Sequence, residues 1–308
     1  MMAIPSYLHL HETGELRQRA RDAAALLSPC RVCPRTCGVD RTLDERGYCG
    51  GGTLPSVASY GPHFGEEPPL VGRFGSGTIF FAGCNMRCVF CQNYQISQLR
   101  EGHEIPWRTL AEMMLSLQDR RCHNINLVSP SHFVPQILQA LCSAADRGLR
   151  IPVVYNTGTY DSVETLRLLD GVIDIYMPDA KYGRDEIARV LSDAPGYVGI
   201  MNEAIREMQR QTGDLLMQDG IAERGLIIRH LVLPDNLADS DRVMEFIASE
   251  ISRDAYINIM DQYRPCGMIT GDTGHPFRDS LMRGITEREY RTAIDIARRN
   301  GLHRGFSY

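Results

Sequence analysis

Three cysteines, Cys84, Cys88 and Cys91, lie in one short loop with the spacing C-x3-C-x2-C. Three thiolates this close together can bind three corners of a 4Fe–4S cluster, because such clusters are held by cysteine sulfur. The loop supplies no fourth thiolate, so one iron would stay open. An open position lets a metal centre bind and activate a substrate, whereas a fully ligated centre is structural. The loop therefore predicts a catalytic iron–sulfur site.

Two plainer interpretations of these cysteines are a zinc site that lacks one ligand and three ordinary buried cysteines. Zinc requires a fourth Cys or His close by, and the next histidine, His103, lies twelve residues beyond Cys91. The run before the loop, residues 78–82, is apolar and rich in β-branched and aromatic residues, which predicts a buried strand ended by Gly83. This position after a strand favours the iron–sulfur interpretation.

A second set of cysteines, Cys30, Cys33, Cys37 and Cys49, has the spacing x2, x3 and x11 in a Gly- and Pro-rich stretch. Four thiolates make a complete ligand set. Such a set is common in closed structural zinc sites. It equally suits a second, fully ligated iron–sulfur cluster that relays electrons. The spacing does not decide between zinc and a second cluster.

Six predicted strands alternate with helices along the rest of the chain. The strands cover residues 78–82, 124–128, 152–155, 174–177, 225–234 and 256–260. Helices are predicted over residues 14–27, 107–121, 162–169, 185–191, 198–211 and 240–251, with another ending near 147 and a last one beginning at the capping box Thr286-x-x-Glu289. Alternation of this kind predicts an α/β fold with a parallel sheet or barrel.

Polar side chains follow the ends of these strands, where the active site of a β/α barrel lies. Besides the three cysteines of the loop, they are Ser129 and His132, Asn156 and Thr157, Asp179 and Lys181, Arg229 and His230, and Gln262 and Tyr263. Asp179 and Lys181 stand two residues apart after a strand, so they would point the same way if the extended geometry continued. For any one of these residues, an ordinary loop role remains the default.

Composition bounds the remaining function classes. The 308-residue chain has a net charge of −5 and a pI of about 6.0, which gives no electrostatic case for nucleic acid or an anionic membrane as a partner. No apolar run approaches the roughly 20 residues that span a bilayer, and the first residues lack the features of a signal peptide. Ten cysteines in such a chain indicate metal ligands in the reducing cytoplasm. Residues 61–77 are linker-like, so His63, Glu66 and Glu67 are expected in solvent, and an arm across the mouth of the site is the alternative.

The loop and the blocks after it resemble the radical S-adenosylmethionine (radical SAM) superfamily. In that family the three cysteines hold three irons, and the amino acid end of SAM chelates the fourth. The blocks NLVSPSH, VVYNTGTYDSVETLRLLDGVIDIYMPDAKY, IIRHLVLP and YINIMDQYRP, preceded by CRVCPRTCGVDR and GYCG, are similar to the PflX-type subgroup of the pyruvate formate-lyase activating enzyme-like branch. One departure follows the second strand, where Val128-Ser129-Pro130-Ser131 replaces the Gly-Gly-Glu run of characterised activating enzymes.

The resemblance implies a partial (β/α)6 TIM-like barrel of the radical SAM type with an N-terminal Cys-rich extension. It divides the chain into an N-terminal helix and Cys-rich arm (1–75), the partial barrel (76–265), and a C-terminal lid-like loop and helix (266–308). The role of the loop from Cys266 to Gly284 stays open. By family position, the SAM-binding residues are Ser129, Asn156, Thr157, Asp179, Lys181 and His230. Asp179 would face the ribose hydroxyls or a bound cation, and Lys181 the SAM carboxylate.

The implied activity is reductive cleavage of SAM. An electron from the reduced cluster breaks the C5′–sulfonium bond and yields a 5′-deoxyadenosyl radical that abstracts hydrogen. Branch membership implies activation of a glycyl radical enzyme, with a flavodoxin- or ferredoxin-type protein as electron donor. The glycine would lie on the glycyl radical enzyme, since this chain has no recognisable glycyl radical domain. Two alternatives stay open: modification of a peptide or small metabolite by the same radical, and a non-catalytic Fe–S electron carrier.

Overall fold

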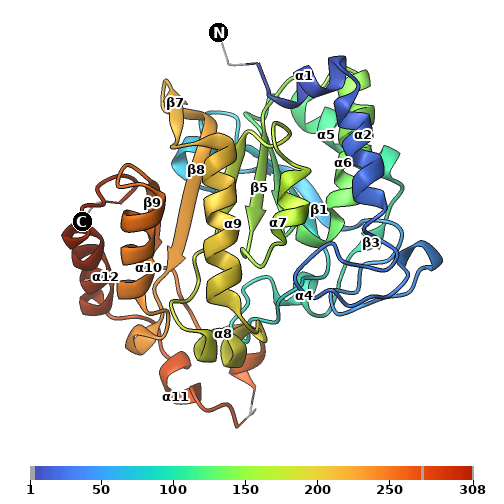
Figure 1. Cartoon of the computed structure of the whole chain (residues 1–308). Coiled ribbons are helices and arrows are strands. Elements are labelled where there is room, and N and C mark those ends of the chain that lie inside the picture. The colour runs from blue at the N-terminus through green and yellow to red at the C-terminus, as the bar shows by residue number, and fades with distance from the viewer. Residues whose placement is uncertain (1–3, 272–273, 307–308) are drawn as a thin grey trace.

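The computed structural model of the chain describes residues 4–271 and 274–306 (Figure 1). In this part of the chain, nine strands form one sheet. They are β1 (Ser56–His63), β2 (Ser76–Phe81), β3 (His103–Glu104), β4 (Ile125–Val128), β5 (Val153–Thr157), β6 (Ile175–Pro178), β7 (Leu216–Gln218), β8 (Ile221–Leu231) and β9 (Tyr256–Met260).

Six parallel strands, in the order β2-β4-β5-β6-β8-β9, make up the central part of the sheet. They coincide with the six strands expected from the sequence, so the predicted α/β partial barrel is confirmed. Helices join these strands because two parallel neighbours require a crossover connection. The carboxyl ends of the six strands consequently lie at one end of the barrel.

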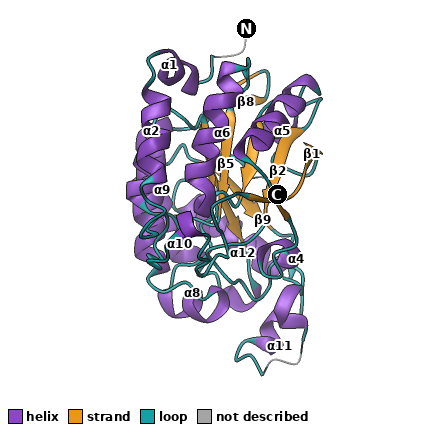
Figure 2. Cartoon of the chain, turned by 90° about the vertical axis from the view of Figure 1, so that its right-hand side faces the viewer, coloured by secondary structure: helices purple, strands orange, loops and turns teal. Residues whose placement is uncertain are grey.

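The described helices are α1 (Tyr7–Glu12), α2 (Glu15–Ala24), α3 (Pro68–Val71), α4 (Tyr94–Ser97), α5 (Trp107–Asp119), α6 (Val134–Asp146), α7 (Val163–Arg167), α8 (Asp185–Ser192), α9 (Tyr197–Thr212), α10 (Ser240–Phe246), α11 (Arg278–Leu281) and α12 (Glu287–Arg299). Helices α2, α6 and α5 pack side by side against the outside of the sheet (Figure 2). In α5, Leu110, Met114 and Leu117 recur at helical spacing and are fully buried. The predicted capping box begins α12. None of the helices in the described residues is both long and apolar enough to cross a membrane.

The antiparallel strand β1 extends the sheet beyond β2, and the sequence does not predict it. Tyr60 pairs with Ile79 and Pro62 with Gly77. A strand that contains Gly61 and Pro62 gives a weak sequence signal, and such residues are tolerated mainly near sheet edges. Part of the region assigned to the arm, 1–75, therefore pairs with the barrel sheet.

The segment after β1 closes the inside of the barrel. Its helix α3 packs on β8, and the fully buried Leu70 joins the same apolar cluster as Val154 and Ile227 from two of the strands. The expectation that Glu66 and Glu67 are solvated is wrong, because their side chains are 8% and 4% exposed. They directly precede α3, so the burial of that helix brings both carboxylates inward.

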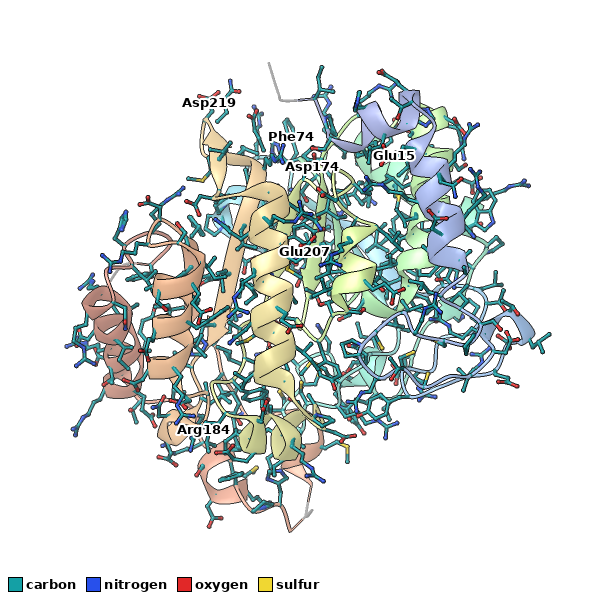
Figure 3. The ribbon with its side chains drawn as sticks, viewed as in Figure 1. Glu15, Phe74, Asp174, Arg184, Glu207 and Asp219 are labelled. Atoms are coloured by element: carbon teal, nitrogen blue, oxygen red, sulfur yellow. The ribbon has the colours of Figure 1, made fainter. Side chains whose placement is uncertain are left out.

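The two ends of the barrel differ. Asp174 directly precedes β6 and lies with Phe74 and Asp219 at one end (Figure 3). Arg184 marks the other end, where it precedes α8, the helix that holds the three-cysteine loop (Figure 3). The loop therefore lies at the carboxyl ends of the strands, where β/α barrels carry their active sites. Within the expected lid, residues 272–273 lie outside the described residues.

Candidate functional site

A cavity of about 240 Å³ lies at the carboxyl ends of the parallel strands. All three cysteines of the loop line it, together with five of the six residues that the resemblance assigned to SAM, namely Ser129, Asn156, Thr157, Asp179 and Lys181. Arg229, Leu231, Met260 and Gln262 also line the cavity. The structure therefore brings the predicted thiols and polar side chains to one place.

Backbone contacts hold the three-cysteine loop on two sides. Gly83, at its start, has φ = 81°, a left-handed conformation that favours glycine. A side chain there would collide with Cys49, because a Cβ would lie 2.3 Å from the Cys49 carbonyl oxygen. On the other side, the backbone amides of Arg87 and Val89 donate to carbonyls at the end of α8 over 2.9 and 2.8 Å. The loop is thus held between the Cys-rich arm and α8.

The loop cysteines are half-buried in a partly polar setting. Burial raises the pKa of Cys84 to about 12, and Cys88 and Cys91 raise it further. Burial also raises the pKa of Cys88, while the Lys181 ammonium opposes that rise. The Ser192 hydroxyl donates to Cys88 Sγ over 3.0 Å. A metal centre that takes these sulfurs as thiolates must displace their protons, so its affinity should increase with pH.

The donor set fits a 4Fe–4S cluster. Among residues 4–271 and 274–306, no group of three or more His, Cys, Asp or Glu side chains is arranged to hold a metal ion as it stands. In a cluster each cysteine binds a different iron, so the cysteine sulfurs lie farther apart than those around a single metal ion. Here three thiols line one cavity, and its described lining residues include no further cysteine. Donor type and number therefore match a cluster with one open iron.

A chain of charged contacts lies beside the thiols. Lys181 Nζ is 2.6 Å from Asp179 Oδ2, and Arg229 Nε donates to Asp179 Oδ1 over 2.7 Å. Arg229 also donates to Asn156 Oδ1 over 2.8 Å, and its Nη1 lies 3.5 Å from Glu67 Oε1. Burial opposes charge on both members of the Lys181–Asp179 pair, but the neighbouring opposite charges outweigh it. The pKa of Lys181 is raised and that of Asp179 lowered, so both stay ionised.

The sequence assigned His230 to the cofactor, but in the structure its neighbour Arg229 lines the cavity and His230 does not. The His230 ring is fully buried, with Nδ1 2.7 Å from Ala180 O and Nε2 2.9 Å from Ser240 Oγ. Burial lowers its pKa to about 4, so the ring is neutral. Successive residues of a strand point to opposite faces, which places only one of the two in the barrel interior.

Ser129 contributes to the cavity wall through its backbone, and the Thr157 hydroxyl is bonded within the protein. Ser129 has φ = 56°, a left-handed conformation that is unfavourable for a residue with a Cβ. Its N–H donates to Asn156 O over 2.9 Å, which holds the end of β4 against β5. The Thr157 hydroxyl donates to the buried Asp161 over 2.6 Å. The hydroxyl is thereby occupied within the protein.

The four cysteines of the arm lie outside this cavity but are gathered with one another. Cys30, Cys33 and Cys49 are buried, whereas Cys37 is exposed. Burial raises the pKa of Cys33 to about 12, and Cys49 and Cys30 raise it further. Burial also raises the pKa of Cys37, with Cys30 and Cys49 adding to the rise. The predicted second set of thiols is therefore a spatial group beside the three-cysteine loop.

A second group of buried carboxylates lies next to Arg229. Glu67 Oε1 accepts from Asn258 Nδ2 over 3.1 Å. Burial raises the pKa of Glu66 to about 7; Arg229 lowers it and Glu67 raises it. On the outer side, His63 Nδ1 lies 3.4 Å from Glu66 Oε1. Glu66 therefore holds a proton near neutral pH inside the barrel.

The fold and the loop define a class of protein. It is a partial parallel barrel with three cysteines in the loop after its first parallel strand, at a cavity formed by the carboxyl ends of the strands. The family model described as the Radical SAM superfamily matches residues 78–247. The chain belongs to the radical SAM superfamily.

Two relatives from Methanocaldococcus jannaschii match most of the chain. The uncharacterized protein MJ0674 is 32% identical over 290 residues, which are 91% of this chain and 77% of the relative. The uncharacterized protein MJ0808 is 22% identical over 249 residues, 73% of this chain and 67% of the relative. Among solved structures, the FeFe-hydrogenase maturase HydG from Carboxydothermus hydrogenoformans is similar over 71% of this chain, with 10% identity and a TM-score of 0.47. The similar part spans 49% of that HydG chain.

The backbone of Ser129 generates a stability prediction. Ser129→Val should lower the free energy of unfolding by about 1–2 kcal/mol, because a β-branched residue is strained at a left-handed φ. Ser129→Gly, the matched control, should stay within about 1 kcal/mol of the parent. Urea unfolding of the three proteins measures the difference. A Val variant as stable as the Gly variant would contradict the left-handed conformation.

The proton on Glu66 generates a pH prediction. Its pKa is about 7 in the folded protein against a reference value of 4.5, so between these values the folded state binds a proton that the unfolded state releases. Stability should therefore fall as pH rises from about 4.5 to 7, and Glu66→Gln should remove a loss on the order of 3 kcal/mol. Urea unfolding across this range checks it, with the exposed Glu186→Gln as control. Curves that run parallel for the parent and Glu66→Gln would refute the assignment.

Proposed function

We propose that the protein cleaves SAM reductively at this cavity and uses the resulting radical to abstract hydrogen from a substrate. The observation that carries the proposal is that three half-buried cysteines and the Lys181–Asp179–Arg229 chain line one cavity. Cys84, Cys88 and Cys91 would hold a 4Fe–4S cluster, which when reduced would supply the electron that breaks the C5′–sulfonium bond of SAM. The protein's own residues bind and orient SAM and exclude water.

The charged chain suits the amino acid end of SAM. Lys181 contacts Asp179 and has further N–H donors, which suit the SAM carboxylate. Asp179 has one oxygen engaged by Lys181 and the other by Arg229, so it orients both cations. The remaining lone pairs of its carboxylate suit the ribose hydroxyls or a bound cation. Asn156, held by Arg229, supplies a further polar wall.

For the substrate, we propose hydrogen abstraction from a backbone glycine of a glycyl radical enzyme, as the resemblance to the activating-enzyme branch implies. The apolar side chains Leu231 and Met260 line the cavity beside the charged chain. An uncharged backbone segment can pack against this apolar wall without burying an unpaired charge. Modification of another peptide or a small metabolite would use the same abstraction step.

The cofactor set we propose consists of the 4Fe–4S cluster at Cys84, Cys88 and Cys91, SAM, and a metal centre bound by the four thiolates of the arm. Each reductive cleavage consumes one electron. A low-potential protein of the flavodoxin or ferredoxin type therefore completes the reaction as electron donor.

The first test is formation of 5′-deoxyadenosine by protein reconstituted anaerobically and supplied with SAM and dithionite. The parent should form it, and Cys84→Ala should form none because one iron loses its ligand. Cys142→Ala, which lies outside both cysteine sets, should behave like the parent. A Cys84→Ala protein active at the parental rate would sink the proposal.

Deuterium transfer into 5′-deoxyadenosine from a glycine-labelled partner enzyme tests the glycyl step. A parent that cycles electrons yet cleaves no SAM would support the electron-carrier alternative.

The second test concerns SAM affinity. Lys181→Ala and Asp179→Asn should keep the parental iron content but bind SAM about tenfold to a hundredfold more weakly, because a lost charge-assisted contact costs roughly 1.5–3 kcal/mol. Arg206→Ala, which breaks an exposed ion pair with Glu250, is the control. Equilibrium dialysis against labelled SAM measures the affinity. If both variants bind SAM like the parent, the pair serves the substrate, a partner or the loop structure instead.

A further inference from the structure

We propose that Cys30, Cys33, Cys37 and Cys49 hold a second 4Fe–4S cluster, which relays electrons from an acidic donor protein to the site at Cys84. The relay rests on the proposed function, since it supplies the electron that SAM cleavage consumes. The sequence spacing suits zinc equally well. The contacts of the arm with the three-cysteine loop favour a redox centre.

The ligand set of the arm consists of sulfur alone and is shaped by tight turns. The Cys30 N–H donates to Val39 O over 2.9 Å, and the Gly38 N–H donates to Cys30 O over 3.1 Å, which folds this stretch back on itself. Gly47 packs beside it, because a Cβ there would lie 2.5 Å from Cys37 Sγ. Four soft thiolates without nitrogen or oxygen ligands suit an iron–sulfur cluster or zinc.

Packed contacts join the two sets of thiols. Asn85 is 5% exposed, and its Oδ1 lies 4.0 Å from Cys84 Sγ. Arg35, two residues after Cys33, donates from Nε to the Asn85 carbonyl over 3.0 Å. The Cys49 carbonyl also packs directly against Gly83. A short, packed path therefore joins the two sets, which electron transfer requires and a structural zinc ion does not.

Buried contacts fix the arm on the barrel. The Arg41 side chain is 1% exposed, and it donates to Gly52 O over 3.2 and 3.0 Å and to His132 O over 2.7 Å. The Thr165 hydroxyl donates to Val32 O over 2.7 Å. Breaking such buried polar contacts is costly, so the arm keeps its position. The separation between the two sets of thiols is accordingly constant.

The exposed thiol of the arm gives the set an outward end with a basic surround. The guanidinium carbons of Arg35 and Arg87 lie 3.7 and 4.4 Å from the centre of the Tyr48 ring. Arg100 donates to Tyr48 O over 3.2 Å, and Tyr48 donates to Asp193 over 2.6 Å. Three arginines, Arg35, Arg87 and Arg100, and one aspartate, Asp193, thus surround Tyr48, which directly follows the Gly47 that packs on Cys37. Charge complementarity suits an acidic electron-transfer protein and speeds the encounter with it.

The proposed step moves one electron and neither makes nor breaks a bond. The reduced donor protein, of the flavodoxin or ferredoxin type, is oxidised by one electron as the arm cluster is reduced. The arm cluster is reoxidised when the electron passes beside Asn85 to the cluster at Cys84. Cleavage of SAM consumes that electron.

Metal content and spectroscopy test the second cluster independently of activity. The parent, prepared anaerobically, should contain about eight irons per chain and no zinc, and Cys33→Ala about four. Cys33→Ala should retain the change that SAM causes in the EPR spectrum of the remaining reduced cluster. Cys142→Ala should keep the parental iron content. About four irons with one zinc in the parent would overturn the proposal.

The choice of reductant tests the relay. With dithionite, Cys33→Ala should form 5′-deoxyadenosine at the parental rate, and with reduced flavodoxin its rate should fall to background. Undiminished activity with flavodoxin, or equal losses with both reductants, would overturn the relay. If Cys33→Ala does not fold, Arg100→Glu takes its place and should keep the parental iron content and dithionite rate but lose the flavodoxin rate. Arg299→Glu on α12 is its charge-matched control. A parent inactive with dithionite would refute the proposed function alone, because iron counts and EPR still decide the second cluster.

Discussion

The site depends on one buried guanidinium. Arg229 is held at once by Asp179, Asn156 and Glu67, so a single side chain ties together β5, β8, the end of β6 and the segment that closes the barrel. A charge in such a place is tolerated only while its partners stay in position, and removing one partner of a buried pair typically costs about 3–5 kcal/mol. Glu67 thereby links the closing segment, which has no thiol, to the geometry of the cavity.

The charges of the interior do not balance by themselves. Three buried carboxylates, Glu66, Glu67 and Asp179, lie near two cations, Lys181 and Arg229. Burial raises the pKa of Glu66 to about 7, so a proton on Glu66 balances these charges below that pH. SAM carries a sulfonium, an ammonium and one carboxylate, a net charge of +1. When Glu66 is ionised, SAM bound near this group would supply the balancing positive charge in place of the proton, so the interior is electrostatically suited to a cationic cofactor.

The sequence predicts the six parallel strands and the position of the thiols because both signals are local: apolar runs ended by glycine or proline, and cysteine spacing. It fails where the decisive fact is a long-range pairing. Strand β1 shows no clean alternation, and only its pairing with β2 makes it a strand. The sequence does not show which of Arg229 and His230 faces the barrel interior, because Ile227 and Ile228 before them are both apolar and both buried. Glu67 becomes a site residue only through α3, whose burial no local pattern indicates.

The contact between Gly83 and the Cys49 carbonyl has a consequence for how this chain and its relatives can diverge. Any side chain at position 83 would press against the arm, so the residue before the first thiol is constrained by a segment more than thirty positions upstream. A lineage that loses the arm escapes this contact, and only the left-handed φ at position 83 then favours glycine. A lineage that keeps the arm must retain the glycine, or shift both the loop that contains Cys49 and the three-cysteine loop.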